Sequence, residues 1–214
     1  MKHPVNKFYQ YLDQPLILHA RWILIVLSLL MLASFAFPLW KIRLEAPQYP
    51  DGLWMEIYAY TVKGGNDDQH ISEINTLNHY IGMHPIDRTA LSDLGWLPFA
   101  FGLLILWGLR VAVVGTVRSL LDLSAMTVYI GLFSFGRFVY KLYSFGHDLA
   151  PDAPVTVEPF TPAIIGSKQI ANFTTYSYPE LGSAFLGTFA VGVIILAILH
   201  LIVGRKDAIR ADEV

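Results

Sequence analysis

The chain has 214 residues, of which 54% are hydrophobic and only 15% are charged, and its formal net charge is −2. Soluble domains carry about a quarter charged residues, so this composition indicates an integral membrane protein. The near-neutral charge gives no basis for nucleic-acid binding. The absence of cysteine excludes disulfides, Cys-ligated zinc or iron–sulfur sites, and haem attachment through C-x-x-C-H.

Residues 1–21 combine aromatic and apolar side chains with charged ones, which predicts an interfacial segment lying on the bilayer. Residues 22–40 form an uncharged run with Trp22 and Trp40 at its ends. At 1.5 Å per residue, about 19 residues cross a hydrocarbon core of about 30 Å, and indoles prefer its interfaces. We therefore predict a first transmembrane helix here. The alternative is a cleaved signal peptide, with Ser34-Phe35-Ala36 as its cleavage site.

Residues 41–94 form the first long polar loop, which begins with helix-breaking prolines. Within it, Leu53–Val62 has the composition of a β-strand and is followed by a Gly-Gly-Asn-Asp turn. Apolar residues then recur at helical spacing from Ile71 until Gly82 stops the pattern. We predict a short helix here that ends in a turn at Gly82.

Three further apolar runs are each long enough to cross the bilayer. A tight turn joins the first two of these runs, a proline-rich loop joins the last two, and a charged tail follows the last. The runs are residues 95–115, 120–143 and 181–203; the turn is 116–119, the loop is 144–180 and the tail is 204–214. The prolines predict an extended, packed loop rather than a helical one. Arg137 and Lys141 lie near the outer end of the third run, where we predict interfacial anchors or partners of loop carboxylates.

Basic residues are concentrated in segment 1–21, the 116–119 turn and the tail, whereas the two long loops are acidic. By the positive-inside rule, both termini face the cytoplasm and both long loops lie outside it. The predicted fold class is thus an all-α integral membrane protein with four transmembrane helices. The two loops form a small extracytoplasmic cap that holds a short helix and one or two strands, and the lipid bilayer is the first predicted partner.

The middles of the four runs contain no ionisable residue that would mark a transport pathway, so a transporter is not favoured. No Ser/His/Asp set, catalytic carboxylate pair or phosphate-binding loop is apparent in the sequence either, so we expect no enzymatic activity. The runs are therefore interpreted as a scaffold, with any chemistry located in the outer loops.

Three ligand-type residues, His79, Met83 and His84, fall within six positions of the first loop. His79 and Met83 are four residues apart and share one face of a helix, and a helix stop at Gly82 would turn His84 toward the same point. Imidazole and thioether ligands suit copper, especially Cu(I), better than zinc, magnesium or calcium. The candidates to complete the site are His70, Met55 and, from the second loop, His147. The alternative is that these histidines cap or pack locally and hold no metal.

Two stretches of the long loops are similar to a known group of proteins. The first is LEAPQYPDGLWMEIY followed by INTLNHYIGMHPI, and the second is GHDLAPDAPVTVEPFTPAIIGSKQIANFTTYSYPELG. Together they resemble the small polytopic membrane proteins that accompany nitrous oxide reductase and its copper-delivery machinery in some bacteria. The resemblance implies a bacterial cytoplasmic-membrane protein with periplasmic loops that supports the maturation or function of a periplasmic cuproenzyme.

We therefore predict copper handling at His79, Met83, His84 and His147, with a periplasmic cuproenzyme or copper-delivery proteins as partners. The alternative is a non-catalytic structural or assembly subunit of a membrane redox complex that has no metal of its own. In that case the loops form a docking surface and the histidines are only packed.

Overall fold

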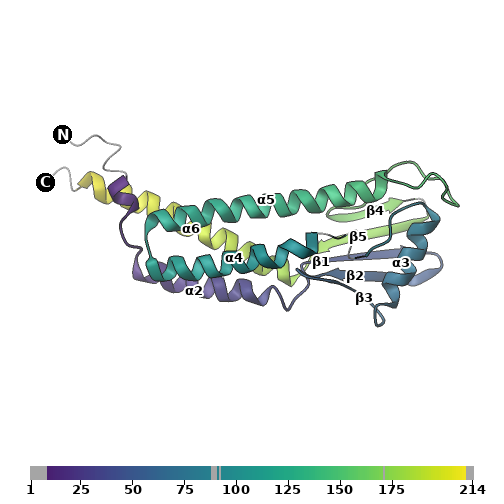
Figure 1. Cartoon of the computed structure of the whole chain (residues 1–214), viewed down its shortest axis with the longest axis horizontal. Coiled ribbons are helices and arrows are strands. Elements are labelled where there is room, and N and C mark those ends of the chain that lie inside the picture. The colour runs from purple at the N-terminus through teal and green to yellow at the C-terminus, as the bar shows by residue number, and fades with distance from the viewer. Residues whose placement is uncertain (1–8, 88–90, 92, 171, 211–214) are drawn as a thin grey trace. The chain divides into compact units, whose positions relative to one another are not determined.

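The computed structural model describes residues 9–87, 91, 93–170 and 172–210, which fall into two compact units. The helical unit comprises Met1–Ala33, Ala100–Gly131 and Phe185–Val214, and the sheet unit comprises Ser34–Phe99 and Leu132–Ala184. Figure 1 labels the helices and strands of both units. The predicted interfacial segment and charged tail lie partly outside the described residues, at 1–8 and 211–214.

Three helices of the described chain are long and apolar enough to cross a membrane. They are α4 (Asp93–Val114), α5 (Val117–His147) and α6 (Leu181–Arg210), and they correspond to the second, third and fourth predicted runs. A helix suits a bilayer because it makes all of its backbone hydrogen bonds internally. Helix α5 has 31 residues, about 46 Å at 1.5 Å per residue, which exceeds a hydrocarbon core of about 30 Å.

The predicted first span, residues 22–40, is wrong in its extent. Helix α2 covers only Leu18–Ala33, and its 16 residues measure about 24 Å, less than the core thickness of about 30 Å. Pro38 lies inside the predicted run and has no N–H to continue a helix. Trp40, predicted as an interfacial anchor, instead opens a strand. The described residues thus hold three candidate spans rather than four.

Helices of the helical unit approach each other closely at two glycines. A β-carbon at Gly108 of α4 would lie 2.4 Å from Oγ of Ser28 in α2. One at Gly192 of α6 would lie 2.6 Å from Cδ1 of Leu27, also in α2. Small residues at such points let helix backbones pack closely. Helix α2 is therefore packed against both α4 and α6 despite its shorter length.

The sheet unit contains a five-stranded antiparallel sheet, so the predicted all-α class is also wrong. The strands are β1 (Trp40–Ala46), β2 (Tyr49–Ile57), β3 (Val62–Gly64), β4 (Gly166–Ile170) and β5 (Phe173–Pro179). Their order is β3-β2-β1-β5-β4, and central Trp40 is paired with Ile57 on one side and Pro179 on the other. The strand predicted at Leu53–Val62 is divided between β2 and β3, and the extended second loop supplies β4 and β5.

Alternation along β1 gives the sheet one apolar and one charged face, because successive side chains of a strand point to opposite sides. Ile42 and Leu44 lie on the apolar face, and Arg43 lies on the charged face. The neighbouring strand follows the same pattern, with Met55 opposite Ile42. The apolar face must therefore be covered by other elements of the chain.

Helix α3 and the second half of α5 cover the apolar face of the sheet. Helix α3 (Gln69–Tyr80) is the predicted short helix, and it ends before Gly82 as expected. Its Ile74 and Asn78 are buried. From α5, the ring of Phe138 packs against Trp40 of β1 with 4.8 Å between ring centroids.

Candidate ligand-binding site

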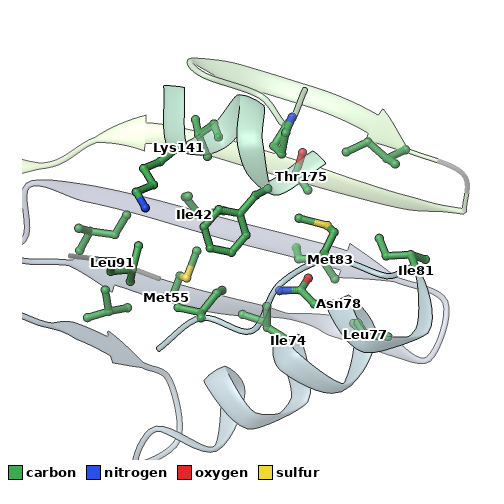
Figure 2. Close-up of a pocket in the computed structure, with 18 of the residues that line it drawn as sticks. Ile42, Met55, Ile74, Leu77, Asn78, Ile81, Met83, Leu91, Lys141 and Thr175 are labelled. Carbon is green, nitrogen blue, oxygen red and sulfur yellow. The ribbon is translucent and has the colours of Figure 1, made fainter. Parts of the chain in front are cut away.

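A largely apolar cavity of about 520 Å³ lies between the apolar face of the sheet, α3 and the second half of α5 (Figure 2). All of its lining residues belong to the sheet unit. Small-molecule sites typically measure about 300–1,000 Å³ and combine apolar walls with a few polar groups. The strands contribute Ile42, Leu44, Met55 and Ile57 to the lining. In size and lining the cavity therefore matches a ligand site.

Two asparagines of α3 hold the turn that closes one side of the cavity. The Asn75 side chain accepts a hydrogen bond from the Ile86 N–H at 2.7 Å and donates one to the Ile86 carbonyl at 3.3 Å. The buried Asn78 side chain donates to the His84 carbonyl at 3.4 Å, and its backbone carbonyl accepts from Met83 at 2.8 Å. These bonds satisfy backbone groups in a segment without regular structure. They fix Met83 and Ile86 in the lining.

Gly82 allows the chain to reverse between α3 and this turn. Its φ is 78°, in the left-handed region that favours glycine. The Gly82 N–H donates to the His79 carbonyl at 3.2 Å, and its carbonyl accepts from Ala150 at 2.8 Å. A β-carbon there would lie 2.9 Å from the Ala150 carbonyl oxygen. The glycine thus joins the end of α3 to the second long loop.

Helix α5 presents two stripes to the cavity. Ser134, Arg137 and Lys141 form a polar stripe, at spacings of three and four that place them on one helix face. Phe138 and Leu142 belong to the apolar stripe beside it. Figure 2 shows the Lys141 side chain extending from α5 toward the strands, with its amine in the cavity region. The two cations were predicted at an interface, and the structure places them in the lining of a cavity.

The opposite face of the sheet is charged. The Lys41 amine lies 3.2 Å from a Glu56 carboxylate oxygen, and Arg43 lies 2.9 Å from Glu45. Partly exposed pairs of this kind contribute about 0–1 kcal/mol each to stability. The Glu45 carboxylate also raises the pKa of Tyr176 above its ordinary value of 10. These paired charges suit a solvated surface, so the cavity side is the better candidate site.

The predicted metal ligands of the first loop have different surroundings. His79 is exposed on α3. Met83 lines the cavity, where Figure 2 shows its sulfur atom. His84 is about half exposed, and its Nε2 lies 2.9 Å from Oδ2 of Asp148. That contact brings the loop after α3 to the residue that follows His147 in the sequence.

The remaining candidate ligands already have packing roles. His147 ends α5, with Nδ1 2.9 Å from the Tyr143 carbonyl and its ring stacked on Tyr143. His70 accepts a hydrogen bond from the Trp54 N–H at 3.2 Å, and Met55 lines the cavity. No group of three or more His, Cys, Asp or Glu side chains in the described ranges is arranged to hold a metal. Because methionine sulfur is not among those ligand types, copper binding at the predicted set stays a prediction.

The cavity is absent from the predictions made from the sequence, although a signal for it exists there. Residues 41–46 alternate charged and apolar side chains, which is typical of a strand with one buried face. Arg137 and Lys141 interrupt an apolar run four residues apart. The uncharged stretch before residue 41 obscures the strand because it continues an apparent transmembrane helix.

Comparisons with known proteins assign this chain to no family. No protein-family model, no curated protein and no solved structure matches the chain. The resemblance to proteins that accompany nitrous oxide reductase therefore stays a prediction, and the interpretation of the site depends on its own residues.

Proposed function

We propose that the sheet unit binds a small apolar or amphipathic molecule in its cavity, and that the chain is a membrane protein presenting this site outside the cytoplasm. The observation that carries the proposal is the cavity of about 520 Å³ with largely apolar walls. This volume and these walls are typical of small-molecule sites, which measure about 300–1,000 Å³.

The proposed membrane placement is supported by the three helices that are apolar enough to cross a bilayer. We propose that α2 crosses with them, because it packs closely against α4 at Gly108 and against α6 at Gly192. Four crossings would keep both termini on one side. Arg21 and Arg118 near the predicted cytoplasmic ends agree with the positive-inside rule. The bacterial cytoplasmic membrane is the proposed location.

Photolabelling of the full chain in phosphatidylcholine nanodiscs tests the binding proposal. The probe is hexadecanol carrying a photoreactive diazirine on its chain, and labelled peptides are mapped by mass spectrometry. We expect saturable labelling of β1, β2 and α3, competed by unlabelled hexadecanol. Labelling that is confined to the helical unit, at Ala100–Gly131 and Phe185–Val214, and never saturates would show only lipid exposure and would contradict a ligand site in the sheet unit.

Copper handling for a periplasmic cuproenzyme is a second proposal, and one observation supports it. The 2.9 Å contact between His84 and Asp148 joins the two loops that carry the predicted ligands. His84 follows Met83 directly, and Asp148 follows His147. A soft ion such as Cu(I) would be held by the imidazole and thioether groups of this region.

Metal content measured on the full chain tests the copper proposal. We expect near-stoichiometric copper after loading under reducing conditions and washing, and its loss in the His79→Ala/Met83→Ala/His84→Ala variant. His19→Ala, which removes an exposed histidine of the helical unit, is the matched control and should keep the metal. Full copper in the triple variant, or none in the folded wild type, would overturn the proposal. The second result would favour a structural subunit without a metal of its own.

A further inference from the structure

We infer that the occupant of the cavity is a single-chain anionic amphiphile of the fatty-acid class, with its carboxylate beside Lys141 and Arg137. This inference rests on the proposed binding function and names the ligand of the same site. It follows from three features of the described lining: the charges, the arrangement of polar and apolar groups, and the volume.

The charges of the lining have one sign. Arg137 and Lys141 are its two cations, and no Asp or Glu side chain is among the described residues that border the cavity. A neutral hydrocarbon would gain nothing from these cations, whereas an anionic head group would form charge-assisted hydrogen bonds, which are about twice as strong as neutral ones. Charge therefore selects an anion over a neutral or cationic ligand.

Both cations have capacity for such a ligand alongside their existing contacts. Each already takes part in another interaction within the protein. The Arg137 guanidinium also lies 5.8 Å from the centroid of the Tyr140 ring. A guanidinium offers five N–H donors and an ammonium offers three, so each group can make several hydrogen bonds at once. Their spacing of four residues on α5 places them on one helix face, so a single carboxylate can approach both.

The arrangement of the remaining lining suits one acyl chain. Phe138 and Leu142 of α5 continue the surface next to the polar stripe, and Ile42 and Met55 face them from the sheet. An extended hydrocarbon chain makes no hydrogen bonds and is stabilised by contact with such apolar side chains. A volume of about 520 Å³ is too small to enclose a two-chain phospholipid.

Competition between two ligands with the same chain tests the inference. Unlabelled palmitate and unlabelled hexadecanol compete with the photoreactive hexadecanol for the strand peptides of the full chain in phosphatidylcholine nanodiscs. In the wild type we expect palmitate to compete about tenfold better, the gain of one charge-assisted hydrogen bond. In Lys141→Met, which keeps the aliphatic stem and leaves Arg137 in place, the preference should fall, and in Arg137→Gln/Lys141→Met the two should compete about equally. Lys141→Arg should restore the preference.

The matched control is Lys63→Gln, which removes an exposed cation of the sheet unit that does not line the cavity. It should leave the palmitate preference unchanged. Equal competition by palmitate and hexadecanol in the wild type would overturn the inference that the ligand is anionic, while leaving the proposed binding function intact. An undiminished preference in the combined Arg137→Gln/Lys141→Met variant would also overturn it. Absence of saturable strand labelling would instead contradict the proposed function itself.

Discussion

Replacing Ile42 with tryptophan is expected to lower the affinity for a cavity ligand by more than about tenfold, which corresponds to about 1.4 kcal/mol. Ile42 lies at the centre of the sheet wall of the cavity (Figure 2). An indole there would extend into the volume that the ligand needs, on the side that faces Phe138 and Lys141. Filling an existing cavity does not carry the usual cost of overpacking, so the variant should remain folded.

The matched control for this variant is Arg43→Trp. Arg43 is the next residue of β1, and its side chain lies on the opposite, charged face of the sheet. Arg43→Trp places the same new side chain one residue further along the strand and on its other face, so it should leave saturable photolabelling of the strand peptides intact. Unchanged labelling in a folded Ile42→Trp variant would show that the ligand does not occupy this cavity. Thermal unfolding of both variants in detergent verifies that they are folded.

Replacing Gly146 with alanine is expected to destabilise the sheet unit by about 3 kcal/mol, through overpacking and the loss of a hydrogen bond. A β-carbon at Gly146 of α5 would lie only 1.8 Å from the carbonyl oxygen of Phe160. That atom belongs to the backbone and cannot move by a change of rotamer. The segment at Phe160 must therefore shift, which breaks the 2.9 Å hydrogen bond from its N–H to the Gly146 carbonyl.

Gly136→Ala is the control for Gly146→Ala, because it makes the same change in the same helix. Apart from the adjacent residues and the nearby backbone of α5 itself, no heavy atom of the described chain lies within 4 Å of a β-carbon at Gly136. Alanine has a higher helix propensity than glycine, so Gly136→Ala should be neutral or stabilise the protein by up to about 1 kcal/mol. The measurement is thermal unfolding of the full chain in detergent, followed by near-UV circular dichroism. Equal midpoints for the two variants would contradict the close contact between α5 and Phe160.

Features governed by neighbouring residues could be predicted from the sequence of this protein. The apolar runs that become α4, α5 and α6 are recognisable because burial in a bilayer needs about 20 consecutive apolar residues. Helix α3 and its end near Gly82 were also predicted correctly. Helical periodicity and the left-handed preference of glycine act within a few residues, so the chain order alone reveals them.

The sheet and the cavity depend on residues far apart in the chain. Trp40 was assigned to a helix because it ends an uncharged run. An apolar run does not by itself distinguish a buried strand from a helix. Its strand is defined by pairing with β5, where Trp40 lies opposite Pro179. The lining likewise combines Ile42 with Lys141 across about a hundred positions. Composition and periodicity therefore determined the three helices that are long and apolar enough to cross a membrane. The strand pairing and the cavity were decided by tertiary packing, because they bring together segments that are far apart in the chain.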